Sequence, residues 1–87
     1  MKNSLNEMLI KTKEVEELRR QVKGLETLME QAYVDTEHYE KTGDKWMEDI
    51  CAGCYNVYNE TRIKMLLKIN KLEREILEFE YRAAISN

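Results

Sequence analysis

Hydrophobic residues recur at alternating intervals of three and four along the first half of the chain. The two apolar positions of this seven-residue repeat are filled by Met8, Val15, Val22 and Met29, and by Leu18, Leu25 and Ala32. Lys11 interrupts the second position once. The repeat is typical of an amphipathic helix in a coiled coil and predicts a helix over about residues 4–40. Asn3 or Ser4 can cap it, and Glu7 would complete a capping box with Ser4.

A second apolar pattern runs through the other half. It is formed by Met47, Cys51, Cys54, Tyr58, Thr61, Met65, Ile69, Leu72, Ile76, Phe79 and Ala83. Two consecutive steps of four, from Thr61 to Met65 and on to Ile69, indicate a stutter that relaxes a left-handed supercoil. The pattern predicts a second helix over about residues 45–85.

One break separates the two patterns, at about residues 41–44. Gly43 can adopt the left-handed conformation that ends a helix, and Thr42 or Asp44 can cap the next one. Folding the chain here opposes Met8 to Phe79, Val15 to Leu72, Leu18 to Ile69, Val22 to Met65, Met29 to Tyr58, and Ala32 to Cys54. The break therefore favours an antiparallel hairpin.

Charges provide an independent check of this register. Lys11 and Lys13 would face the region of Glu73 and Glu75, and the lysines of residues 64–71 would face acidic residues between 14 and 26. Exposed pairs contribute about 0 to 1 kcal/mol each, yet several together can select an orientation. We predict an all-α fold: a single-domain, coiled-coil-like antiparallel hairpin.

The apolar stripe widens beyond a two-helix seam at Leu28 and Tyr33 in one helix and at Leu66 and Leu67 in the other. A chain of 87 residues buries only a modest core by itself. Exposed apolar patches of this kind usually meet a partner. The sequence therefore predicts a homodimer in which two hairpins form a four-helix bundle.

Composition narrows the functional classes. Charged residues make up 36% of the chain with a net charge of −3, which argues against a general binder of nucleic acid or anionic membranes. No segment approaches the roughly 20 apolar residues of a membrane span, and the first residues do not resemble a signal peptide. We expect a cytoplasmic protein. The chain is rich in Lys, Asn, Ile, Tyr and Glu, a composition that is common in low-GC bacteria and their phages. For a phage-encoded protein the expected location is the cytoplasm of the host.

Cys51-Ala52-Gly53-Cys54 is the one string with the appearance of reactive chemistry. A structural zinc site needs four ligands, whereas His38 is the only histidine available to join the two thiols. Redox enzymes place this motif at a helix N-terminus, and here it lies within a helical pattern. We therefore predict that both cysteines pack in the seam as small hydrophobes and that the protein has no cofactor. Zinc bound by His38, Cys51 and Cys54 is the main alternative, and redox activity is a weaker one.

Catalytic motifs are missing. The chain has one histidine, no nucleophile elbow, no phosphate-binding glycine loop and no zinc-protease motif. Its carboxylates follow the pattern of a solvated helix face. We expect no enzymatic activity.

The bend region combines acidic and aromatic residues. Residues 30–49 contain seven acids and two lysines, a local net charge of −5. Aromatic residues beside charges are common in protein-binding sites. We predict a partner-binding surface formed by Tyr33, Glu37, Tyr39, Glu40, Asp44, Trp46 and Glu48. The alternative is that the aromatic residues only close the end of the core.

A basic stripe provides the other candidate surface. It consists of Arg62, Lys64, Lys68, Lys71 and Arg74. The stripe could contact nucleic acid, or the acidic bend could mimic nucleic acid, but pairing with the acidic first helix is the preferred reading. The leading functional hypothesis is a noncatalytic module that associates with itself and with an unidentified protein.

Overall fold

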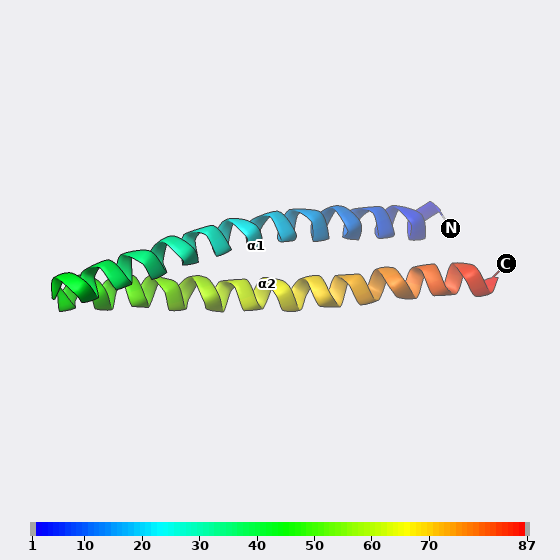
Figure 1. The fold of residues 1–87 in the computed structure, drawn as a ribbon. Coiled ribbons are helices and arrows are strands. Elements are labelled where there is room, and N and C mark those ends of the chain that lie inside the picture. The colour runs from blue at the N-terminus through cyan, green and yellow to red at the C-terminus, as the bar shows by residue number, and fades with distance from the viewer. Residues whose placement is uncertain (1, 87) are drawn as a thin grey trace.

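The computed structural model describes the backbone of residues 2–86 and the side chains of residues 5–86. Two α-helices, α1 (Lys2–Thr42) and α2 (Lys45–Ser86), form a rod of 66 × 15 × 13 Å. They run antiparallel, with both termini at one end of the rod (Figure 1). The all-α hairpin is confirmed, with helices slightly longer than expected. The predicted cap at Asn3 or Ser4 falls outside the described side chains.

The turn between the helices needs only two residues. Gly43 has φ = 78°, the left-handed conformation that its missing side chain permits. Its amide donates to the carbonyl oxygen of Glu40 at 3.3 Å, and the amide of Asp44 donates to that of Tyr39 at 3.0 Å. These two bonds form a Schellman motif, which satisfies carbonyl groups at the end of α1.

Asp44 also begins the second helix. Its Oδ1 accepts a hydrogen bond from the amide of Met47 at 3.2 Å, as expected of an N-cap residue. Thr42, the other predicted cap, donates its hydroxyl to the carbonyl oxygen of Tyr39 at 3.2 Å. One residue, Asp44, therefore closes α1 and starts α2.

The core lies in the half of the hairpin nearer the termini. Its central cluster consists of Val15, Leu18, Val22, Ile69 and Leu72, with Met65 and Ile76 packed against it. Met29 and Ala32 are also buried on α1. These residues belong to the predicted register, and Ile69 is the most buried of them at 3% exposure. The apolar repeat thus identified most of the core.

On α2 the observed seam differs from the predicted one. Cys54 and Ala83 are exposed, whereas Tyr55 and Arg62 are half-buried. The half-buried and buried positions form an unbroken heptad through Cys51, Tyr55, Tyr58, Arg62, Met65, Ile69, Leu72, Ile76 and Phe79. Thr61, where the stutter was predicted, is half-buried like Arg62, so both residues border the seam at this level. The repeat of α1 is itself unbroken, so a continuous repeat on α2 matches it layer by layer.

The exposure of Ala83 has a separate cause. In the observed register its level along the rod corresponds to residue 4, in the first turns of α1. Ala83 thus lies at the end of the rod that carries both termini. The seam therefore ends near Phe79, which is half-buried.

Ion pairs cross the seam on both of its sides. Lys11 Nζ lies 2.9 Å from Glu75 Oε2, and Lys68 Nζ lies 3.0 Å from Glu14 Oε1, as the charge pattern predicted. Arg19 bridges to Glu73 at 2.7 Å, a pair that the pattern did not identify. Their partly exposed side chains limit each pair to a small contribution, but all three fix the same register.

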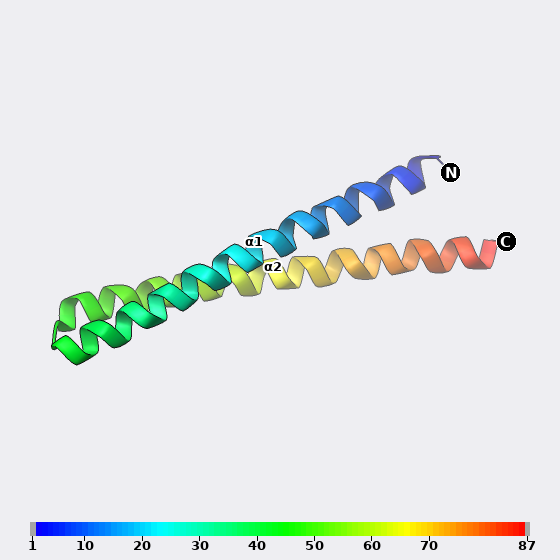
Figure 2. The same cartoon turned by 45° about the horizontal axis from the view of Figure 1, so that its top comes forward.

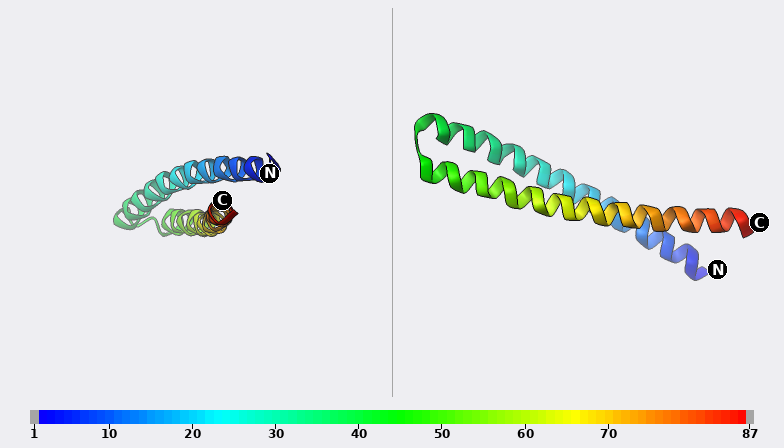
Figure 3. Two further views of the ribbon diagram at one scale, coloured as in Figure 1. Left: turned by 90° about the vertical axis from the view of Figure 1, so that its right-hand side faces the viewer. Right: turned by 90° about the horizontal axis from the view of Figure 1, so that it is seen from below.

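The two helices wrap around each other along the rod. In Figure 1 α1 lies along one side of α2 for most of the rod, in Figure 2 the two helices cross near its middle, and the end view of Figure 3 shows α1 arching over α2. Such wrapping keeps a seven-residue repeat facing its partner helix over many turns. Within residues 2–86, neither helix has a stretch apolar enough to cross a membrane.

Candidate functional site

The bend brings the predicted partner-binding residues to one end of the rod. Tyr33, Glu37, Tyr39 and Glu40 come from the last turns of α1, and Asp44, Trp46 and Glu48 from the start of α2. Trp46 is 73% exposed, so it does not close the end of the core. Its indole is a large apolar surface directed to solvent beside several carboxylates.

Some of these residues have structural contacts of their own. Asp44 caps α2, and Glu48 is half-buried with its carboxylate 3.8 Å from Lys45 Nζ. Tyr39 is half-buried, with its ring in an edge contact with His38 at a centroid distance of 5.1 Å. Glu37 and Glu40 are exposed like Trp46. The bend surface thus divides into residues that hold the turn, such as Asp44, and exposed residues, such as Trp46 and Glu40.

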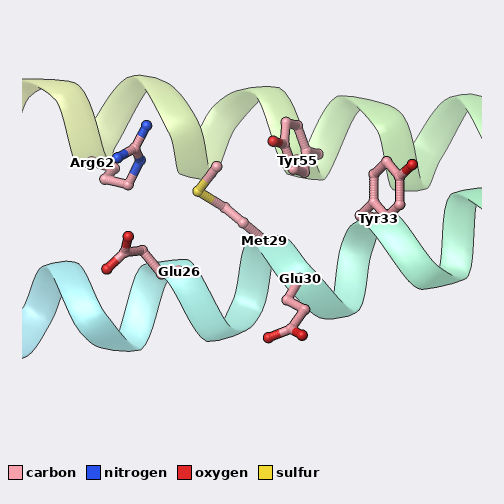
Figure 4. A pocket seen from close by; sticks show the side chains of 6 residues that line it. All are labelled: Glu26, Met29, Glu30, Tyr33, Tyr55 and Arg62. Atoms are coloured by element: carbon pink, nitrogen blue, oxygen red, sulfur yellow. The ribbon is translucent and has the colours of Figure 1, made fainter.

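Tyr33 forms part of an open hollow between the helices (Figure 4). The hollow has a volume of about 390 Å³ and is lined by Glu26, Met29, Glu30, Tyr33, Tyr55 and Arg62. The rings of Tyr33 and Tyr55 lie 6.5 Å apart at 55°. A hydrogen bond to the Glu37 carboxylate, reinforced by its negative charge, raises the pKa of Tyr33. The hydroxyl of Tyr33 is thus linked to Glu37 on the same helix.

The sequence pattern placed Tyr33 at this surface but missed Tyr55 and the position of Arg62. Counting back from Ile69 in alternating steps of four and three would have reached Arg62 and Tyr55. Arg62 was assigned to a basic outer stripe because its charge suggested exposure. In the structure its guanidinium donates to Asn59 Oδ1 at 3.0 and 3.3 Å, while Arg62 itself is half-buried in the seam. An arginine stem can pack in this way while its head remains hydrogen-bonded.

Two residues of the predicted basic stripe are engaged within the hairpin. Lys68 is engaged by Glu14, and Arg62 lies in the seam. Lys64, Lys71 and Arg74 are exposed. Lys64 and Lys71 are one heptad apart, while Arg74 follows three residues later, about 60° farther round the helix. Lys64, Lys71 and Arg74 therefore form a narrower exposed basic strip on α2, which Arg62 and Lys68 do not join.

The two cysteines have different surroundings. Cys51 is half-buried, and its pKa is raised first by this burial and then by the negative charge of Asp35. Cys54 is exposed, which corrects its predicted place in the seam. Three residues span about 300° of a helix, so the two thiols lie about 60° apart on neighbouring parts of the α2 surface, with only Cys51 turned toward α1. Among the described residues, no group of three or more His, Cys, Asp or Glu side chains could hold a metal ion, so His38 does not join the thiols.

Large apolar side chains occupy the outer faces of both helices. On α2 they form two rows, the first made of Trp46, Ile50 and Val57 near the bend, and the second of Ile63, Leu67, Leu77 and Tyr81 toward the C-terminal end. Leu28 and Val34 are exposed on α1. Within the described part of the chain, these rows leave large apolar side chains open to solvent.

Comparison of the chain with protein-family models, with curated proteins and with solved structures gives no match. A functional interpretation therefore rests on the geometry and chemistry of these surfaces.

Proposed function

We propose that the hairpin is a noncatalytic interaction module that associates with a second copy of itself and binds a partner protein. The observation that supports this proposal is the ratio of exposed to buried apolar residues. Among the described side chains, fifteen large hydrophobic residues are exposed, whereas seven hydrophobic residues are buried. Monomeric proteins rarely expose contiguous rows of large apolar side chains to water. Where such rows occur, they usually form contact surfaces with another molecule.

The exposed leucines are distributed over two sides of the seam. Leu28 lies two heptads after Glu14 and therefore on the side of that residue's ion pair with α2. Leu66 lies one heptad before Glu73 and shares the side of the other ion pair. A single flat contact cannot cover both sides. Two associated hairpins bring four helices together, and the apolar residues that they leave open are available to a different protein.

The bend surface suits a partner with a basic and apolar face. Trp46 offers an aromatic anchor, and Glu37 and Glu40 are exposed carboxylates at the same end of the rod. In protein interfaces such anchors chiefly slow dissociation, whereas charges at the rim accelerate encounter. The local net charge of −5 over residues 30–49 favours a cationic partner.

The test combines measurement of mass with affinity capture. Sedimentation equilibrium is expected to give about twice the 10.4 kDa monomer. Proteins captured from the native source should be lost with Trp46→Ala and reduced when Glu37 and Glu40 are changed to Lys. Asp44 and Glu48 stay unchanged, because the first caps α2 and the second is half-buried.

A matched control carries the same charge change elsewhere. Glu7 and Glu16 are exposed on α1, far from the bend, and their replacement with Lys should leave capture intact. Circular dichroism must show equal helix content in all variants. Capture that survives the Trp46 and Glu37/Glu40 changes would remove the bend from the binding surface, and a monomer at high concentration would remove self-association.

A further inference from the structure

The outer row on the C-terminal half of α2 repeats with the period of the buried seam. Residues 63, 67, 70, 74, 77, 81 and 84 follow one another at alternating steps of four and three, and are Ile63, Leu67, Asn70, Arg74, Leu77, Tyr81 and Ala84. The four large apolar members are 45% to 68% exposed. At about 100° per residue, this row lies roughly 150° around α2 from the seam, facing away from α1. We call it the outer heptad.

We propose that the outer heptad is the self-association surface, and that it pairs antiparallel with the outer heptad of a second copy about a twofold axis near residue 72. The pairing rests on the proposed self-association and specifies its geometry. An apolar repeat of this period is what a helix presents to another helix in a coiled coil. A twofold pairing uses the same surface on both copies and closes the assembly at two chains.

One register opposes residues of like character. It places Ile63 against the partner's Tyr81, Leu67 against the partner's Leu77, and Asn70 against the partner's Arg74. In an antiparallel pairing the residue numbers of opposed residues have a constant sum. This sum is 144 for the outer heptads of the two copies and 87 for the seam within one hairpin. A shift of one heptad would set Arg74 against the partner's Leu77 and Asn70 against the partner's Tyr81. That shift would bury polar groups against apolar ones, so it is disfavoured.

Charges beside the outer heptad select the antiparallel orientation. In the same register Lys71 meets the partner's Glu78, and symmetry repeats the contact. Both residues are exposed, and neither takes part in an ion pair within the described part of the chain. A parallel pairing would instead set Glu73 beside the partner's Glu78 and Arg74 against the partner's Arg74. Like charges at such positions oppose association.

The acidic bends support the same orientation. Each carries a local net charge of −5, and a parallel dimer would hold the two bends side by side. The antiparallel dimer separates them to opposite ends. Residue 72 lies 28 residues beyond Asp44, or about 42 Å at 1.5 Å per residue, so the two bends would be about 85 Å apart. This exceeds the 66 Å length of one hairpin, whereas two fully overlapping hairpins would remain near that length.

Mutation of the outer heptad tests the contact. Changing Leu67 and Leu77 to Glu should weaken dimerisation by roughly 100-fold or more in sedimentation equilibrium, because these pairs lie at its centre. The matched control is Ile50→Glu with Val57→Glu, which alters the other exposed row of α2 near the bend. The control should remain dimeric, and circular dichroism should show that both variants keep their helix content.

Charge exchange provides a second test that leaves the apolar contact intact. Lys71→Glu alone and Glu78→Lys alone should each weaken the dimer by roughly 5-fold, and the double exchange should restore it. Small-angle X-ray scattering of the wild-type dimer should give a maximum dimension near the expected separation of the bends, about 85 Å.

The outcomes distinguish this geometry from the broader proposal. A dimer that survives Leu67→Glu with Leu77→Glu but is lost in the Ile50 and Val57 control would place self-association on the other row. Failure of the charge exchange to restore binding, or a maximum dimension near that of one hairpin, would overturn the antiparallel register. A wild-type monomer at high concentration would overturn the pairing and self-association together, while capture through Trp46 would still test the partner-binding half of the proposed function.

Discussion

Replacement of Ile69 by Ala probes the small core directly. Ile69 is 3% exposed and belongs to the central cluster of the hairpin. The change removes three carbon atoms, which at about 0.8 kcal/mol per buried methylene loses about 2.4 kcal/mol of transfer free energy. The cavity left behind adds to this loss. The higher helix propensity of Ala recovers up to roughly 0.5 kcal/mol, so the free energy of unfolding should fall by about 2 to 3 kcal/mol.

This loss is large for a two-helix protein. At about 0.05 to 0.15 kcal/mol per residue, a chain of this length has a total stability of roughly 4 to 13 kcal/mol. The change would therefore remove between about 15% and about 70% of it. Urea denaturation followed by circular dichroism, at a protein concentration low enough to keep the chain monomeric, measures the difference.

Ile10→Ala is the matched control. Ile10 undergoes the same chemical change but is 65% exposed on α1. Its replacement should alter stability by no more than about 0.5 kcal/mol. Equal effects of the two substitutions, or a loss below about 1 kcal/mol for Ile69→Ala, would show that the seam is not the principal core.

Three further outcomes follow from the turn, the cysteines and the ion pairs. Gly43→Ala should cost about 1 to 2 kcal/mol of unfolding free energy in the same urea assay, because φ is 78° and an L side chain is strained there. Iodoacetamide should label exposed Cys54 before Cys51, whose pKa is raised by burial; peptide mass mapping that finds equal rates would contradict this. The hydrogen bond from Lys11 lowers the pKa of Glu75 below its ordinary value of 4.5. The stabilisation that the ionised Glu75 provides is therefore complete above pH 4.5 and is lost as the pH falls through the lowered pKa. Glu75→Gln should reduce this acid sensitivity in thermal melts at several pH values, and an unchanged pH profile would exclude the role.

Much of the fold could be predicted from the sequence because two kinds of information agreed. The repeat on α1 and the single glycine at a break fixed the helices and the turn, and complementary charges such as Lys11 with Glu75 fixed their register. Each of these signals is local or periodic. They can therefore be read from the sequence without knowledge of tertiary contacts.

The seam of α2 was harder to predict because hydrophobicity and register disagreed there. Cys54 and Thr61 look more apolar than Tyr55 and Arg62 as seam candidates, yet Cys54 is exposed and Arg62 half-buried. The continuous repeat of α1 determines which side of α2 faces it. A long side chain such as that of Arg62 can occupy a seam position because its guanidinium donates hydrogen bonds to a nearby acceptor, Asn59. Residue type alone does not indicate such a contact.

The candidate surfaces were predictable by composition but not in detail. The acidic and aromatic character of the bend was evident, and Trp46 proved to be exposed. The assignment of Asp44 to the turn required its contact with Met47, and the division of the basic stripe required the position of each residue around α2. The local composition shows which kinds of side chain are close in the sequence, whereas the geometry of the helix determines which of these side chains lie on the same face.

The placement of the core away from the turn has a mechanical consequence. Both termini lie at one end of the rod (Figure 1), so a force applied between them would peel the helices apart like a zipper. The first turns, where Leu5, Leu9 and Tyr81 are exposed, offer little resistance. The central cluster around Ile69 would then form the main barrier, and beyond it few buried residues remain before the bend. Rupture of that cluster should therefore release most of the hairpin in one step. The force needed to separate the helices would then be set by about two heptads of the seam.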